Sequence, residues 1–190
     1  MREMKDIVLM RDPEGFLKPD QVRLLLKVCE NDTELILVSL LWRTGARISE
    51  ILQLKKKSIN LEQQTITIPT LKRKKPLTRT ITIEPSLFDK LRSYVENMDD
   101  ESFLFTFDRF KAYRIVQKLG KRAGIVMVGK KLLHPHNFRH SFSIHAVKSG
   151  VPVPILKNLL GHASIHTTGF YLQFSDEESR DYLKKMWKKG

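Results

Sequence analysis

The sequence is poor in the residues that define several classes of protein. Its 190 residues include one cysteine, Cys29, so no disulfide can form within the chain and a disulfide-framed secreted domain is excluded. No apolar run approaches the roughly 18 residues of a membrane-spanning helix, and residues 1–15 lack the apolar core of a signal peptide. Glycine and proline, with 9 and 8 residues, are too few for a fibrous or disordered chain. We therefore expect a soluble, cytoplasmic protein of one ordinary domain.

Acidic residues are absent from one long stretch of the chain. No Asp or Glu lies between residues 109 and 175, and this absence excludes a paired-carboxylate site or carboxylate-bound Mg²⁺ there. A solvated surface usually interleaves charges of both signs. The same stretch holds eleven basic residues: Arg109, Lys111, Arg114, Lys118, Lys121, Arg122, Lys130, Lys131, Arg139, Lys148 and Lys157.

Basic residues exceed acidic ones over the whole chain, 34 to 21, which gives a net charge of +13. Between Lys55 and Arg79 eight basic residues stand against one acid, Glu62. Such an excess attracts polyanions, nucleic acid first and anionic membranes second. We favour a footprint on a nucleic-acid phosphate backbone over a merely lysine-rich surface.

The periodicity of apolar residues predicts a mainly α fold with a small antiparallel β-sheet (α+β). Val22, Leu25, Leu26 and Cys29 recur at helical spacing, and Thr33 is the expected N-cap of a second, very apolar helix. Alternating residues predict two strands, 65–68 and 80–83, joined by a very basic hairpin loop. Helices are expected over 18–30, 33–42, 47–54, 85–96, 108–124, 135–149, 152–160, 165–170 and 177–189.

All six histidines lie between residues 134 and 166, and two interpretations compete. His136 and His140 stand at i,i+4, a good spacing for metal ligands. Against a metal, the region offers no cysteine or carboxylate to complete or orient the ligand shell. The second interpretation is phosphoryl transfer without a metal, and we expect no cofactor and no metal.

Phosphoryl transfer needs bidentate cations, an in-line nucleophile and a proton donor for the leaving oxygen. His136 and Arg139 share one helix face near its positive N-terminal end. Arg47 follows the turn at residues 44–46, with Glu50 at i+3 able to hold its guanidinium. A third candidate, Tyr171, lies in the acid-free region. Taken alone, Arg47 is more often a surface arginine in an ion pair, and a tyrosine such as Tyr171 is more often a packed side chain.

The motifs in combination are more specific than any one of them. Thr44-Gly-Ala-Arg-Ile-Ser-Glu50 is followed by the basic hairpin, by His136-x-x-Arg139-His140, by Leu-Leu-Gly-His162, and by Thr167-Thr168-x-x-Tyr171. In order and spacing this series resembles the catalytic domain of the tyrosine recombinase (phage integrase) family. The resemblance covers roughly residues 13–171.

The resemblance implies a role for each matched residue. Arg47 and Arg139 would clamp the scissile phosphate, and Tyr171 would be the nucleophile that links to the DNA 3′-phosphate. His136 and His162 would donate hydrogen bonds, and His136 could also accept the tyrosine proton. A hairpin lysine would protonate the leaving 5′-oxygen; Lys72 fits best and Lys74 second, although the glycines that usually flank this lysine are absent. Further contacts to DNA are expected from Lys74, Lys75, Arg79, Lys121, Arg122, Lys130, Lys131 and His140.

The same resemblance implies a domain organisation and partners. We expect an N-terminal extension or linker remnant over 1–12, the catalytic domain over 13–174, and a tail helix over 175–190 that could pack on a neighbouring protomer. The partners implied are double-stranded DNA and further copies of the chain, as a tetramer on DNA, with no membrane. The family usually carries an N-terminal DNA-clamping domain, so the chain is either a fragment or a short form.

The expected activity is site-specific DNA recombination or integration, through a 3′-phosphotyrosine and without metal or ATP. Two alternatives stay open at this point. One is DNA relaxation of the type IB topoisomerase kind, which shares the chemistry. The other is a non-cleaving, DNA-binding remnant of the fold.

Overall fold

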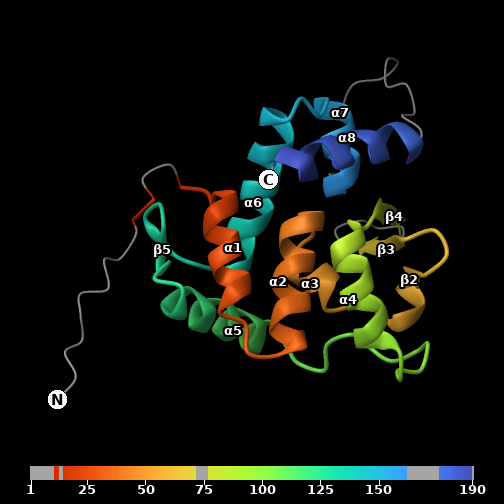
Figure 1. Ribbon diagram of the computed structural model, residues 1–190, viewed down its shortest axis with the longest axis horizontal. Helices are drawn as coiled ribbons and strands as arrows, with labels where there is room; N and C mark the ends of the chain where they lie inside the picture. Colours follow the sequence, from red (N-terminus) through yellow and green to blue (C-terminus); the bar gives the residue numbers. More distant parts are fainter. Residues whose placement is uncertain (1–10, 13–14, 72–76, 162–175, 190) are drawn as a thin grey trace.

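The computed structural model describes residues 11–12, 15–71, 77–161 and 176–189. Helices dominate this part of the chain, as expected, and Figure 1 shows their arrangement. The helices are α1 (Pro19–Lys27), α2 (Asp32–Thr44), α3 (Ile48–Ile51), α4 (Pro85–Val95), α5 (Arg109–Arg122), α6 (Pro135–Lys148), α7 (Val153–Leu160), α8 (Asp176–Lys189) and the short 3-10 helix η1 (Lys56–Ser58).

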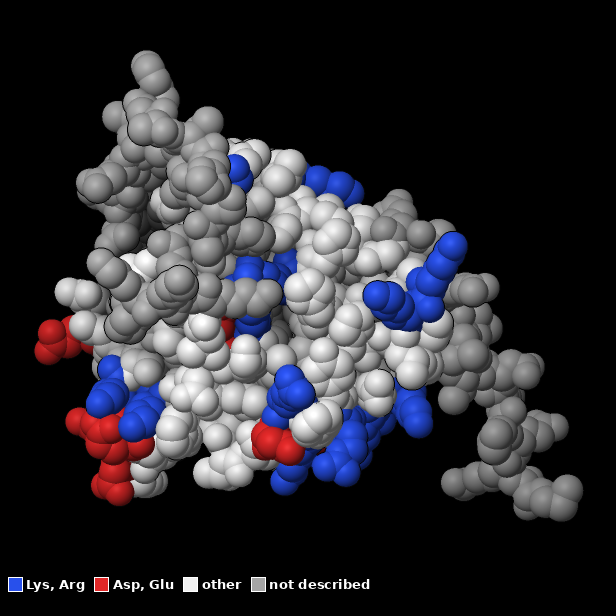
Figure 2. Space-filling view, turned by 180° about the vertical axis from the view of Figure 1, so that it is seen from behind, with Lys and Arg blue, Asp and Glu red and all other residues white. Residues whose placement is uncertain are grey.

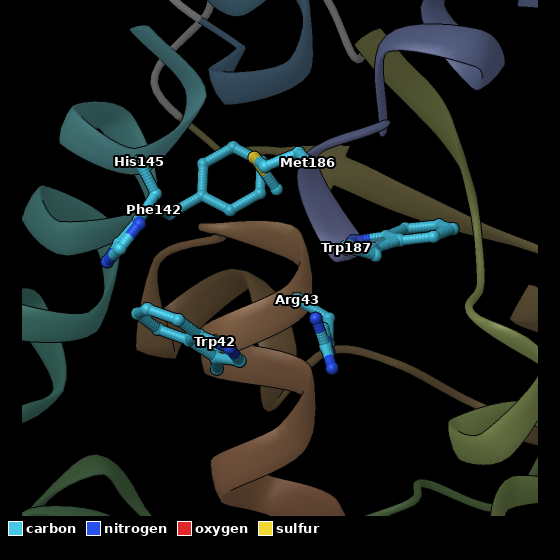
Figure 3. A pocket seen from close by; sticks show the side chains of 6 residues that line it. All are labelled: Trp42, Arg43, Phe142, His145, Met186 and Trp187. Atoms are coloured by element: carbon cyan, nitrogen blue, oxygen red, sulfur yellow. The ribbon is translucent and has the colours of Figure 1, made fainter. Parts of the chain in front are cut away.

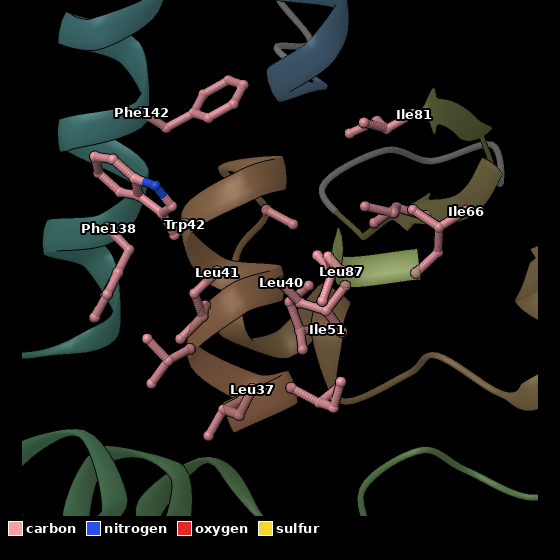
Figure 4. Close-up of a cluster of buried hydrophobic side chains, with 14 of the residues drawn as sticks. Leu37, Leu40, Leu41, Trp42, Ile51, Ile66, Ile81, Leu87, Phe138 and Phe142 are labelled. Atoms are coloured by element: carbon pink, nitrogen blue, oxygen red, sulfur yellow. The ribbon is translucent and has the colours of Figure 1, made fainter. Parts of the chain in front are cut away.

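Helix α2 is the centre of the fold because it is apolar around most of its circumference. It lies between α1 and α6 on one side and α3 and α4 on the other (Figure 1). Ile36, Leu37, Leu40 and Leu41 are fully buried. Figure 4 shows these leucines meeting Phe138 and Phe142 of α6 on one flank and Ile51, Ile66 and Leu87 on the other. One continuous core therefore joins the helices to the sheet.

The described strands form two small sheets. Strands β2 (Ile59–Asn60), β3 (Thr65–Thr70) and β4 (Leu77–Thr82) pair antiparallel in the order β2-β3-β4, which confirms the predicted hairpin. The second sheet was not predicted: β1 (Arg11–Asp12) pairs parallel with β5 (Met127–Val128), which pairs antiparallel with β6 (Lys131–Leu132). Strands of two residues are too short to show alternation in the sequence.

Helix α8 packs against the chain's own α6 and β4. Leu183 and Met186, on the inner face of α8, are buried. Figure 3 shows Met186 and Trp187 facing Trp42 and Arg43 of α2 and Phe142 and His145 of α6, the residues that line a small pocket. The predicted packing of this tail on a neighbouring protomer stays a prediction.

Several helix ends differ from the prediction: α1 and α3 each end three residues before the predicted residues 30 and 54, and α2 begins at a different cap. The Asn31 side chain accepts a hydrogen bond from the Glu34 amide at 2.9 Å, so Asn31 is the N-cap and Thr33 is not. The Thr33 hydroxyl instead lies 3.2 Å from the Tyr94 hydroxyl. The expected helix at 165–170 falls outside the described residues. Among the helices described, none is long and apolar enough to cross a membrane.

Candidate active site

Arg47 is placed by a sharp reversal of the chain after α2. Helix α2 ends at Gly45, whose φ of 60° lies in the left-handed region that favours glycine. A Cβ at this position would lie 2.5 Å from the Phe142 ring, so the chain also needs glycine for space. Two residues later Arg47 caps the short helix α3, and its side chain is 21% exposed. The Arg47 side chain is therefore partly accessible while its backbone is fixed.

Glu50 forms an ion pair with Arg47 and is itself completely buried. Its Oε1 accepts from Arg47 Nη1 at 2.9 Å and its Oε2 from the Arg47 amide at 3.0 Å. The same Oε2 accepts from Arg79 Nη2 at 2.7 Å. Burial disfavours the charged form, but the hydrogen bonds from Arg79 and Arg47 outweigh it and hold the pKa of Glu50 below its ordinary value. The expectation that Glu50 supports Arg47 agrees with this geometry.

Arg139 comes from α6 and is 5% exposed. Its Nη1 donates to the Gly45 carbonyl and its Nη2 to the Leu160 carbonyl, both at 2.8 Å. Burial and the nearby charge of Arg47 lower the pKa of Arg139 to about 10. The two arginines, 92 positions apart by their numbers (139 − 47), are therefore neighbours in the fold.

His136 lies one turn before Arg139 on the same helix. Its side chain is exposed, yet partial burial of the ring and the charges of Arg139, His134, His140 and Arg47 lower the pKa of His136. The lowered pKa favours the neutral imidazole, which can accept a proton at one ring nitrogen and donate a hydrogen bond from the other.

Charge is unbalanced at this point of the molecule. Three guanidinium groups, those of Arg47, Arg79 and Arg139, lie around the carboxylate of Glu50, which pairs with Arg47 and Arg79. Among the residues that the structure describes, this is the one carboxylate that balances them. Figure 2 shows blue side-chain atoms set back in a hollow near the middle of the face that it displays, with little red beside them. A cationic cluster with a partly exposed arginine and an imidazole whose neutral form is favoured can bind a single anion and stabilise negative charge that develops on it.

The structure brings together three of the six predicted catalytic residues: Arg47, His136 and Arg139. Lys72, His162 and Tyr171, and the expected DNA contacts Lys74 and Lys75, lie outside the described residues. Lys121, Lys130, Lys131 and His140 are exposed, as contacts to DNA need to be.

Two of the predicted DNA contacts are engaged inside the protein. The Arg79 side chain is 9% exposed and pairs with Glu50. Arg122 pairs with Glu30, which precedes α2, and with Glu34 in the first turn of α2. Arg79 donates to groups of the protein through all three of its guanidinium nitrogens, whereas the hydrogen bonds of Arg139 to carbonyls use Nη1 and Nη2. The nitrogens that a phosphate would need are therefore occupied at Arg79, and the expectation that Arg79 contacts DNA does not agree with its geometry. The sequence shows the charge of these residues but not their partners.

Several residues of the site were not singled out from the sequence. The carbonyls of Gly45 and Leu160 hold Arg139, and a row of rings leads from Tyr113 through His134 to His136, with centroids 6.2 and 6.5 Å apart. The glycines give the signal in the sequence, since Gly45 ends α2 at a φ of 60° and Gly161 ends α7 at a φ of 64°.

The fold is that of the tyrosine recombinase class of domains. The model of the phage integrase family matches residues 15–178, and the chain belongs to that family. It is similar to a tyrosine recombinase of Pseudothermotoga lettingae, 31% identical over 182 residues that cover 92% of this chain and 62% of the relative. It is also similar to tyrosine recombinase XerA of Pyrococcus furiosus, 32% identical over 181 residues, 89% of this chain and 60% of the relative.

A solved structure gives the same result for the fold. The crystal structure of XerA recombinase matches with a TM-score of 0.67 and 29% identity, and the match covers 92% of this chain and 64% of that chain. The chain thus spans about 60% of the length of the curated relatives that it matches.

Proposed function

We propose that this protein is a site-specific DNA recombinase that cuts and rejoins strands through a 3′-phosphotyrosine intermediate. The observation that carries the proposal is the convergence of Arg47 and Arg139 at one place, where Glu50 is the one carboxylate, among the residues that the structure describes, to balance the local arginines. A phosphodiester there would meet two guanidinium groups, which match its oxygens in charge and geometry.

The proposed reaction exchanges one phosphate ester for another. The Tyr171 phenolic oxygen attacks phosphorus, the bond from phosphorus to the 5′-oxygen breaks, and a 5′-hydroxyl leaves. His136 accepts the phenolic proton, and Lys72, or Lys74 in its place, gives a proton to the 5′-oxygen. Arg47 and Arg139, with His162 as a further donor, neutralise the charge on the non-bridging oxygens. Because the new ester is close in energy to the old one, the reverse attack by another 5′-hydroxyl rejoins the strand without ATP.

The proposed partner is double-stranded DNA, bound in part by the exposed side chains of Lys121, Lys130, Lys131 and His140. Strand exchange between two sites needs several active sites at once, so we propose a tetramer on DNA and action in the cytoplasm. The domain boundaries at residues 12 and 174 belong to this proposal.

The proposal is tested with a suicide DNA substrate, nicked so that the fragment carrying the 5′-hydroxyl diffuses away after cleavage. The wild-type protein should accumulate a covalent protein–DNA adduct in EDTA, and Tyr171→Phe should form none while it binds the same DNA. The absence of an adduct on DNA that the wild-type protein binds would contradict cleavage and favour a non-cleaving remnant. A wild-type adduct that EDTA abolishes would instead favour a metal site.

The choice of DNA substrate distinguishes a recombinase from an enzyme that only relaxes supercoils. Plasmids with two target sites should yield exchanged products, whereas a topoisomerase-like enzyme would relax supercoils at a single site and exchange nothing.

A further inference from the structure

Arg79 is an arginine on the inner face of the β3–β4 hairpin. In the register of the sheet Arg79 stands opposite Ile68, and Ile81, two residues further along the strand, stands opposite Ile66. Since alternate residues of a strand share a face, Arg79 occupies the face on which Ile66, Ile68 and Ile81 are buried. An apolar side chain is what packing alone would select at this position.

The three nitrogens of the Arg79 guanidinium contact three different segments. Nη2 donates to Glu50 Oε2 at 2.7 Å, Nε to the Leu159 carbonyl at 2.6 Å, and Nη1 to Thr70 Oγ1 at 3.3 Å. The side chain is 9% exposed and its carboxylate partner is fully buried. A buried, fully paired arginine of this kind adds little to stability compared with an apolar residue, so its value lies in what it holds in place.

Each contacted segment carries or adjoins a proposed catalytic group. Glu50 fixes both the backbone amide and the guanidinium of Arg47. Leu159 precedes Leu160, whose carbonyl holds Arg139, and His162 follows two positions later in the sequence. Thr70 ends β3, two positions before Lys72.

The close fit around Gly161 supports the same connection. A Cβ on Gly161 would lie 3.0 Å from Arg79 Nη1 and 3.0 Å from Thr70 Oγ1. The end of α7, the hairpin and the Arg79 side chain are therefore in direct contact, without space for another group.

We propose that Arg79 is a positioning residue that locks Arg47, the end of α7 and the β3–β4 hairpin into one arrangement, and that it does not itself contact DNA. This inference rests on the proposed DNA-cleaving function. It replaces the expectation from the sequence that Arg79 neutralises a phosphate.

The two roles differ in what a substitution changes. Loss of a phosphate contact weakens binding to all DNA and lowers the salt slope of binding by about 1. Loss of a positioning residue leaves binding intact and slows the chemical step, since a displacement of roughly 1 Å can cost about 100-fold in rate. DNA affinity measured without cleavage and the rate of a single cleavage event therefore separate them.

The experiment uses Arg79→Gln, Arg79→Lys and the control Arg43→Gln, which removes another partly buried, ion-paired arginine, the partner of Glu84. DNA affinity is measured in a Tyr171→Phe background, and the cleavage rate under single-turnover conditions on the suicide substrate. Arg79→Gln should change affinity less than 2-fold and lower the rate at least 10-fold. Arg79→Lys should recover part of the rate, since a lysine still reaches the Glu50 carboxylate but cannot contact all three segments.

A modified substrate adds a readout that a purely structural role would not move. Replacing one non-bridging oxygen of the scissile phosphate by a methyl group removes the charge that a guanidinium neutralises. If Arg79 acts by positioning Arg47, the ratio of the wild-type cleavage rate to the Arg79→Gln rate should be at least 3-fold smaller on one of the two methylphosphonate diastereomers than on the unmodified phosphate.

The outcomes are distinguishable. Weaker affinity with a lower salt slope in Arg79→Gln would overturn the inference in favour of a phosphate contact. A rate equal to that of Arg43→Gln on both substrates would leave only a contribution to folding. If Arg79→Gln does not fold, Arg79→Lys carries the same comparisons. A wild-type protein that binds DNA but never cleaves it would refute the proposed function and this inference with it, whereas normal cleavage by Arg79→Gln would refute the inference alone.

Discussion

Arg139→Lys tests the need for a forked donor. Lysine keeps the positive charge but cannot donate to both carbonyls and to a phosphate. We expect cleavage to fall by about 100- to 1,000-fold, the range for loss of one donor to a developing oxyanion. Single-turnover kinetics measure the cleavage rate, with DNA affinity as the control. Cleavage within 3-fold of wild type would mean that the charge alone suffices.

The residues of the site differ in how far the sequence could predict them. Arg47, His136 and Arg139 were identified from short motifs, and the fold brings these three together. The groups that hold Arg139 were not identifiable, because backbone carbonyls such as those of Gly45 and Leu160 belong to every residue and carry no signature in the sequence. Arg79 has the same charge as a DNA contact, and only its hydrogen-bond partners in the fold distinguish the two roles.

The stability of the protein should depend on pH through two histidines, His136 and His145. Partial desolvation of each ring is the main cause that lowers the pKa values of His136 and His145 from 6.5 in the folded protein. The unfolded chain therefore binds more protons as the pH falls through 6.5, and the free energy of unfolding falls with it. The melting temperature should drop between pH 7.5 and 5.5, and less steeply in His145→Gln. An unchanged slope in that variant would contradict the assignment for His145.

Elements were more predictable than their ends. Long helices such as α2 and α5 carry strong apolar periodicity and begin at side chains that cap them, Asn31 and Asp108. Asn31 caps α2, whereas the Thr33 hydroxyl contacts the Tyr94 hydroxyl instead. The sequence does not show that tertiary contact, so it could not decide between the two caps. In the second sheet, β1 pairs with β5 from a distant part of the chain, and no local pattern reports that pairing. β5 and β6 are neighbours in the sequence, but two residues each are too few to show alternation.

Helix α8 should stabilise the domain through its apolar face. Leu183 is 1% exposed, so Leu183→Ala should lower the free energy of unfolding by about 2–5 kcal/mol. The exposed neighbour Lys184 serves as the control, and Lys184→Ala should change it by less than about 0.5 kcal/mol. Urea denaturation of both variants is the measurement. Equal stabilities would mean that α8 does not pack on its own chain in solution.

At the scale of the whole molecule the distribution of charge carries the functional information. The excess of 34 basic over 21 acidic residues was visible in the sequence, as was the acid-free stretch. The sequence did not show that acidic residues of the other segments neutralise some of these charges, as Glu30 and Glu34 do for Arg122. The net charge therefore overstates the number of side chains free to meet DNA.

Salt dependence of binding distinguishes the free charges from the paired ones. Lys130→Gln and Lys131→Gln should each lower the slope of log affinity against log salt by about 1, because each lysine displaces a counterion from DNA. Lys90→Gln, an exposed lysine of α4 outside the acid-free stretch, is the matched control and should leave the slope unchanged. Identical slopes in all three variants would remove this surface from the DNA interface.

The chemical linkage between protein and DNA tests the central claim most directly. The adduct trapped on the suicide substrate is digested with protease and nuclease, and the linked peptide is sequenced by mass spectrometry. We predict a single nucleotide joined through its 3′-phosphate to the phenolic oxygen of Tyr171. A linkage to any other residue, or to a 5′-phosphate, would contradict the account.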